Sequence, residues 1–154
     1  MFPPSTTSWL RIIAVLWLLW GAVHLLAGVL TVTLDTASAV QGIADGVDPA
    51  LLDVTYPAAA GAVIKQHGWN LGWIGLTTMI CAVFIWRSRS VTAAWLATLV
   101  GGLADVGYFL FLDLGGFVKF VPGTVMTIIS GTAIMLTAFV HSKRAKASPA
   151  NAST

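Results

Sequence analysis

Four long apolar segments dominate the chain, and nearly all of the charged residues lie outside them. An α-helix of about 20 apolar residues is long enough to cross the hydrocarbon core of a bilayer. A helix also satisfies its backbone hydrogen bonds internally, as a lipid environment requires. The pattern therefore predicts an all-α, polytopic integral membrane protein whose spans cover residues 9–32, 67–86, 91–112 and 120–140.

The turns that join the later spans are short. One is Ser88-Arg89-Ser90, and the other contains Gly115-Gly116. Short connections favour antiparallel neighbours in a helix bundle. We therefore expect one four-helix, up-down-up-down membrane domain over residues 1–144. A disordered cytoplasmic tail rich in Ala and Ser is expected over residues 145–154.

Charged residues are scarce and unevenly distributed. They make up 9% of the chain, against 57% hydrophobic residues, whereas a soluble domain has about 25% charged residues. Six basic residues gather at the start of the first span, at the turn between the second and third spans, and after the fourth: Arg11, Arg87, Arg89, Lys143, Arg144 and Lys146. Two, Lys65 and Lys119, fall on the other side. The positive-inside rule then predicts cytoplasmic termini and an outer loop over residues 33–66, in a plasma or inner membrane. We interpret these residues as topological signals and expect no nucleic-acid partner.

The first span has an alternative reading as a signal peptide, because Ala37-Ser38-Ala39 resembles a cleavage site. The apolar core of a signal peptide is about 7 to 15 residues long, however, and the run here is longer and contains His24. We therefore expect the span to be retained. Cleavage at Ala39 would remove His24 and leave three spans.

The outer loop is long for a connection within a helix bundle. Asp48-Pro49 resembles a helix cap with proline at the first helical position, and Pro57 is placed to open a helix that runs into the second span. Two readings remain open here. The loop forms a partly helical lid over the outer face, or it is a solvated linker with some interfacial helix.

Small residues recur at four-residue spacing within the spans. Gly68 and Gly72 form one such pair, and Gly123, Thr127 and Gly131 form another series. Residues of this kind let helix backbones approach closely in lipid. Spacing alone leaves open whether they face other helices of the chain or a partner, so a homo-oligomer and a larger membrane complex are both candidate assemblies.

Polar residues from all four spans fall at a similar depth. His24 follows Arg11 by 13 residues and Asp105 follows Arg89 by 16. At 1.5 Å per residue these spacings place the two side chains roughly 20 and 24 Å from the inner basic residues. Asn70, Thr127 and Tyr108 lie near the same level. The sequence therefore predicts a polar layer in the outer half of the bundle.

Asp105 is the acid that most needs an explanation, since an ionised acid near mid-membrane costs at least ~2.5 to 3.5 kcal/mol and should face a partner inside the bundle. His24 is the expected hydrogen-bonding partner, which makes His24 and Asp105 the candidate catalytic residues. The candidate ligand-binding residues are the polar and aromatic side chains around them: Asn70, Tyr108, Thr127, Trp20 and Trp73. The alternative is a purely structural hydrogen-bonded network.

Metal chemistry is not predicted, because His24 and Asp105 are fewer ligands than a transition-metal site uses. The chain has one cysteine, so it has no Cys-x-x-Cys motif, and the sequence specifies no cofactor. The leading functional hypothesis is a small membrane protein that binds a lipophilic or small ligand in an outward-opening polar pocket, or serves as an accessory subunit of a membrane complex. The alternatives are an intramembrane enzyme acting on a lipid-like substrate and an oligomeric proton-coupled carrier.

Overall fold

The structure is a computed structural model that describes residues 4–147, and all of its regular elements are helices. The first span is α1 (Pro4–Thr33) and the second is α4 (Ala58–Ser88). Two short helices lie between these two spans, α2 (Thr36–Ile43) and α3 (Pro49–Leu52). The third span combines α5 (Val91–Ala97), the π-helix η1 (Thr98–Gly102), α6 (Leu103–Tyr108) and the π-helix η2 (Phe109–Asp113). The fourth span combines the π-helix η3 (Phe120–Thr124) and α7 (Val125–Ala147). The expected all-α architecture with four long apolar helices is confirmed.

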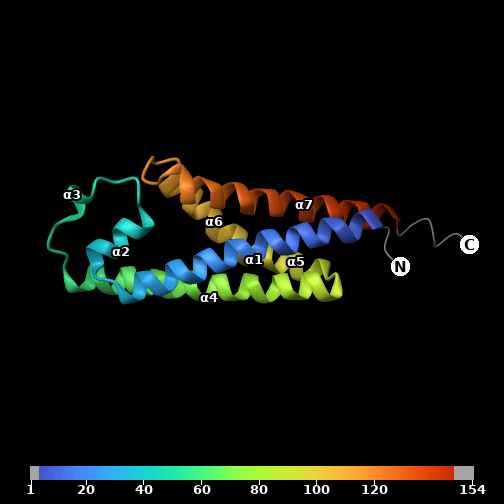
Figure 1. The fold of residues 1–154 in the computed structure, drawn as a ribbon, viewed down its shortest axis with the longest axis horizontal. Coiled ribbons are helices and arrows are strands. Elements are labelled where there is room, and N and C mark those ends of the chain that lie inside the picture. Colours follow the sequence, from blue (N-terminus) through green and yellow to red (C-terminus); the bar gives the residue numbers. More distant parts are fainter. Residues whose placement is uncertain (1–3, 148–154) are drawn as a thin grey trace, which may run out of the picture.

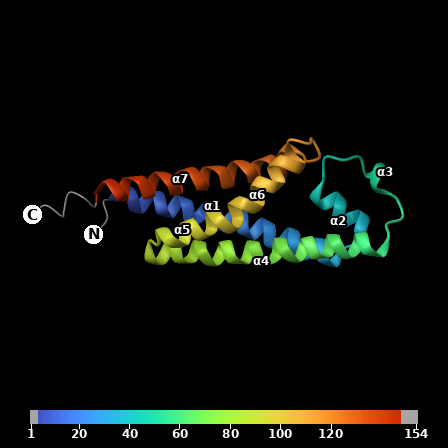
Figure 2. The ribbon, with the colours of Figure 1, turned by 180° about the vertical axis from the view of Figure 1, so that it is seen from behind.

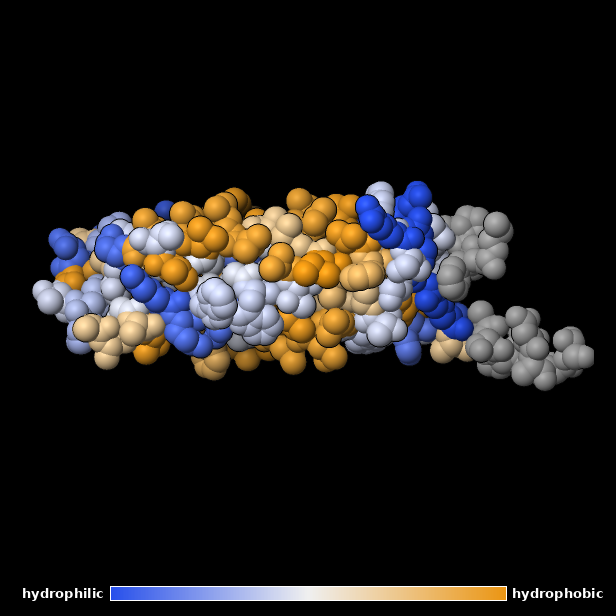
Figure 3. All heavy atoms as spheres, turned by 90° about the horizontal axis from the view of Figure 1, so that it is seen from below, coloured by the Kyte–Doolittle hydropathy of each residue, from blue (hydrophilic) through white to orange (hydrophobic). Residues whose placement is uncertain are grey.

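The spans run alternately up and down the bundle (Figure 1). The start of α1 and the end of α7 lie at one end, and α2 and α3 lie at the other. Strongly hydrophilic residues gather near both ends, and hydrophobic residues cover much of the surface between them (Figure 3). Four helices are long and apolar enough to cross a membrane, so the chain has the build of a multi-pass membrane protein in contact with lipid.

Glycine allows α1 and α4 to pack closely along their length. A Cβ atom added to Gly28 would lie 2.5 Å from the backbone nitrogen of Gly72 and 2.6 Å from the carbonyl oxygen of Gly68. A Cβ atom on Gly21 would lie 2.6 Å from the carbonyl oxygen of Gly75. The Gly68 and Gly72 pair therefore faces another helix of the same chain.

The large buried side chains lie in the half of the bundle that contains the start of α1. They are Leu10, Ile13, Trp17, Trp20, Ile85 and Val140. The third span then crosses the bundle (Figure 2): α5 packs against α4, whereas α6 and η2 pack against α7 and η3. As a result the pair formed by α1 and α4 and the pair formed by the third and fourth spans diverge toward the other end.

The first connection is partly helical, which agrees with both interpretations of the outer loop. Asp48 caps α3 by accepting a hydrogen bond of 3.0 Å from the Ala50 amide, and Pro49 occupies the first turn. Pro57 directly precedes α4, which confirms its role as a helix opener. Asp35 caps α2 through the Ser38 amide at 3.0 Å.

The helix that Pro57 opens runs into the second span, so the apolar stretch expected at 67–86 is the later part of a longer helix that begins at Ala58. Ala58-Ala59-Ala60 has strong helix propensity and forms its first turn. The connection therefore covers residues 34–57 instead of 33–66. At the other end α7 continues through Ala147, so residues 145–147 are helical and not part of a disordered tail. The rest of the expected tail, 148–154, lies outside the described residues.

Candidate functional site

Asp105 is the centre of a buried hydrogen-bonded network. Its side chain lies on α6 and is 3% exposed. The Trp20 indole Nε1 donates to Asp105 Oδ1 at 3.1 Å, and the Ser130 hydroxyl donates to Oδ2. The carboxyl group thus joins three spans, because Trp20 lies on α1 and Ser130 on α7.

His24 is fixed against the same tryptophan. Its ring stacks on Trp20 with 3.5 Å between ring centroids and 18° between ring planes. Its Nδ1 lies 2.8 Å from the Trp20 carbonyl oxygen. A carbonyl oxygen only accepts hydrogen bonds, so Nδ1 carries the hydrogen. In the neutral ring Nε2 is then a free acceptor, and it has no hydrogen-bond partner within residues 4–147.

The expected direct hydrogen bond between His24 and Asp105 is not formed. The Trp20 indole links the two side chains instead: its N–H group bonds to Asp105 and its ring face stacks on His24. The depth of two residues along their helices places them at one level, but it does not determine the direction of their side chains. Here the indole N–H group of Trp20, not His24, donates to the Asp105 carboxyl group.

Ser130 is a member of this network that the predicted polar layer does not include. Its hydroxyl contacts Asp105 and also lies 3.0 Å from the Thr127 carbonyl oxygen. Serine hydroxyls in membrane helices often bond back to their own backbone, which hides a second role. The available signal was position, because Ser130 lies about one helical turn from the predicted layer.

Tyr108 and Thr127 contribute two further polar groups on the same pair of spans. Tyr108 lies on α6, and a Cβ atom added to Gly123 would come within 2.8 Å of its hydroxyl oxygen. Gly123 therefore lets the tyrosine hydroxyl approach the backbone where the fourth span begins. Thr127 Oγ1 is buried and has no hydrogen-bond partner in the described part of the chain.

Asn70 and Trp73 pair with each other on α4. Trp73 Nε1 donates to Asn70 Oδ1 at 3.2 Å, and Trp73 is 45% exposed. Among residues 4–147 no hydrogen bond joins this pair to His24 or Asp105. The structure therefore brings Trp20, Asp105 and His24 together, while Asn70 and Trp73 form a separate contact.

The connection after α2 is attached to the turn between the third and fourth spans. The Gly46 amide donates to the Phe117 carbonyl oxygen at 2.9 Å, and the Lys119 amide donates to Asp45 Oδ1 at 2.8 Å. Helix α2 itself packs against α1 and α4. This segment bridges the diverging helix pairs at the end of the bundle nearer to His24.

Within residues 4–147, no three side chains of His, Cys, Asp or Glu come close enough together to hold a metal ion. The chemistry available at the site is hydrogen bonding and proton transfer through His24, supported by the Trp20 and Asp105 contacts. Comparison with protein-family models, curated proteins and solved structures finds no match to this chain.

Proposed function

We propose that this multi-pass membrane protein binds a lipophilic ligand that carries a hydrogen-bond donor, in a pocket that opens outward beside His24. The observation that carries the proposal is the free Nε2 of an imidazole that is otherwise fixed, through its Nδ1 bond and its stacking on Trp20. A histidine held in one tautomer presents a defined acceptor to a ligand.

The contacts behind His24 support this role. Trp20 is fully buried, and its N–H bond to Asp105 sets the rotation of the indole about its side-chain bonds. The indole face in turn sets the plane of the imidazole. Asp105 therefore acts as a positioning residue, through Trp20, and does not contact the ligand itself. Groups that position a binding residue in this way reduce the ordering cost of binding.

The surroundings favour a ligand with an apolar body and one polar end. Small-molecule pockets are mostly apolar with a few convergent polar groups. Here the diverging helix pairs supply apolar side chains, and the Tyr108 hydroxyl and Thr127 Oγ1 are further polar groups toward the same end. Asn70 and Trp73 stay as candidate ligand contacts at the surface of α4.

The proposed orientation follows from charge. Six of the eight Lys and Arg residues occur toward the end where α1 begins, against Lys65 and Lys119 toward the other end. The positive-inside rule assigns the more basic end, with both termini, to the cytoplasm of a plasma or inner membrane. The His24 half of the bundle then faces outward. Helix α2 and its attachment to Phe117 and Lys119 form a lid over this half.

Native mass spectrometry of protein purified in mild detergent tests the proposal. The wild type should carry a small-molecule mass that His24→Phe loses, because phenylalanine keeps an aromatic ring over Trp20 but has no ring nitrogen. His67→Phe is the matched control, since His67 is exposed on α4. A wild type without bound ligand, or a His24→Phe protein that retains it, contradicts the proposal. The intact mass also reports whether the chain is a homo-oligomer or an accessory subunit.

The free Nε2 also supports a second candidate, an intramembrane enzyme that uses His24 as a general base on a lipid-like substrate. In that case His24→Phe keeps the bound mass or accumulates it, whereas the wild type converts it. Comparing the masses released from the two proteins after incubation distinguishes an enzyme from a binding protein.

A further inference from the structure

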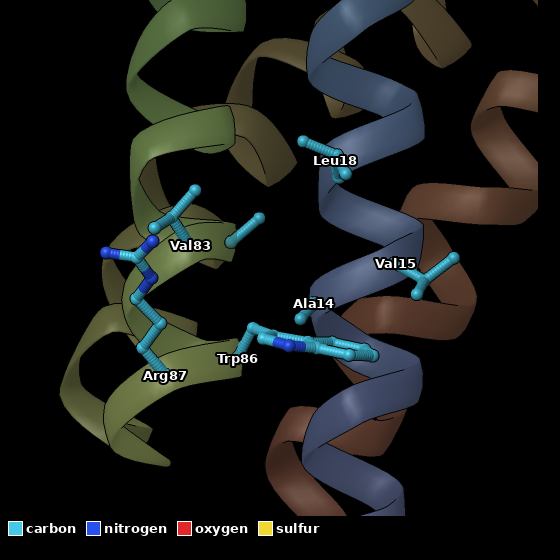
Figure 4. Close-up of a pocket in the computed structure, with 7 residues that line it drawn as sticks. Ala14, Val15, Leu18, Val83, Trp86 and Arg87 are labelled. Atoms are coloured by element: carbon cyan, nitrogen blue, oxygen red, sulfur yellow. The ribbon is translucent and has the colours of Figure 1, made fainter.

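A groove lies between α1 and α4 in the half of the bundle where α1 begins (Figure 4). Its volume is ≈ 370 Å³, within the range of about 300 to 1,000 Å³ typical of ligand pockets. The lining is apolar except for one arginine: Ala14, Val15, Leu18, Ala82, Val83, Trp86 and Arg87.

Residue size explains why the groove is there. Ala14 and Ala82 are buried where the helices approach, and their small side chains leave space above them. The Trp86 indole extends from α4 toward α1 below Ala14 and closes one end of the groove (Figure 4). Val83 at the rim is 46% exposed, so the groove opens sideways to the surrounding lipid.

Two positive charges lie near the groove. The Arg87 side chain, which lines the groove, extends along α4 beside Val83 (Figure 4). The Arg11 guanidinium lies 5.5 Å from the centre of the Trp86 ring. The six acids of the chain are all aspartates, and none lies nearby: four are in the first connection, Asp105 is in the buried network and Asp113 is at the outer turn. Within residues 4–147, neither guanidinium has a carboxylate to pair with.

We propose that this groove is a binding site for one anionic phospholipid. An acyl chain lies along Ala14, Leu18 and Val83, the Arg87 guanidinium binds the phosphate, and Arg11, held against the Trp86 ring, adds positive charge to this part of the surface. Arginine forms forked hydrogen bonds to phosphate oxygens and stacks on aromatic rings, which suits the place beside Trp86. An acyl chain gains little hydrophobic free energy by leaving bulk lipid, so the charged head group must supply the selectivity.

The test is native mass spectrometry of the full chain in detergent micelles that contain phosphatidylglycerol or phosphatidylcholine with the same acyl chains. The wild type should retain one phosphatidylglycerol in preference to phosphatidylcholine. Arg87→Gln should weaken phosphatidylglycerol retention about fivefold, the effect of one basic residue near an anionic lipid. Val83→Trp should fill the groove and reduce retention of both lipids.

Two matched variants control for charge and bulk. Lys146→Gln removes a positive charge near the same end of the bundle, away from the groove, and Leu99→Trp adds the same bulk at an exposed position on the third span. Both should retain phosphatidylglycerol as the wild type does. Equal retention of the two lipids by the wild type, or equal losses in Arg87→Gln and Lys146→Gln, overturns the proposal. A dimer that Val83→Trp disrupts would also overturn it and assign the groove to a second copy of the chain.

Discussion

The acceptor that Asp105 provides for Trp20 can be weighed by comparing two uncharged replacements, Asp105→Asn and Asp105→Ala. Comparing either variant with the wild type would combine two effects: the loss of a hydrogen bond, and the removal of a buried charge. The cost of the buried charge alone is ~2.5 to 3.5 kcal/mol on insertion scales. Both variants lack the charge. The amide oxygen of asparagine can still accept from Trp20 Nε1, whereas alanine leaves that N–H group buried without a partner.

The expected difference follows from the donors that lose their acceptor. The Ser130 hydroxyl has a second acceptor, the Thr127 carbonyl oxygen at 3.0 Å, so it remains bonded in both variants. In Asp105→Ala only the Trp20 N–H group loses its acceptor, and leaving a buried donor without a hydrogen bond costs about 1 to 3 kcal/mol. The free energy of unfolding of Asp105→Ala should therefore be lower than that of Asp105→Asn by about 1 to 3 kcal/mol.

The assay uses Cys81, which is the chain's one cysteine and is 3% exposed. A thiol-reactive dye should label it only as the helices separate, so labelling against denaturant in detergent reports unfolding. Repeating the comparison in a Trp20→Phe background should reduce the gap in free energy of unfolding between Asp105→Asn and Asp105→Ala, because phenylalanine has no N–H group that needs an acceptor. An unchanged gap in that background would refute the role assigned to the hydrogen bond. Ligand retention should follow the same pattern, with Asp105→Asn retaining what Asp105→Ala loses.

Two further predictions concern packing and pH. Gly28→Ala should destabilise the α1–α4 pair by about 1 to 3 kcal/mol, because its Cβ atom would lie 2.5 Å from the Gly72 nitrogen, whereas Gly131→Ala, with no atom within 4 Å, should be neutral in the same dye assay. The hydrogen bonds from Ser38 hold the pKa of Asp35 below its ordinary value, so the cap on α2 contributes fully above about pH 4 and is lost as the pH falls through the lower, folded-state pKa. After correction for the intrinsic exchange rate at each pH, hydrogen exchange at the Ser38 amide should accelerate as the pH falls over that interval. A corrected rate that instead rises as the pH is raised from neutral would contradict this direction.

The spans were predictable from the sequence because run length and composition are properties of the chain alone. Helix caps at Asp48 and Pro57 were predictable for the same reason, since each depends on a few adjacent residues. The link between His24 and Asp105 through Trp20 was not predictable, because it depends on how each helix is rotated about its axis. The π-helical segment η1 changes the rotation of the third span just before Asp105, and no local sequence pattern predicts that change.

The position of the Asp105 network and the divergence of the two helix pairs both follow from the way the third span crosses the bundle. Gly101 within η1 allows the crossing, since a Cβ atom there would lie 2.9 Å from the Trp17 ring and 3.1 Å from the Trp20 ring. Beyond that point α6 turns away from α4, and Asp105 reaches back to α1 through Trp20. The Asp105 carboxyl group therefore lies at the boundary between the apolar core and the part of the bundle where the helix pairs diverge, beside His24. Within residues 4–147, Nε2 of that histidine has no hydrogen-bond partner, and this unused acceptor is the observation on which the proposed ligand site rests.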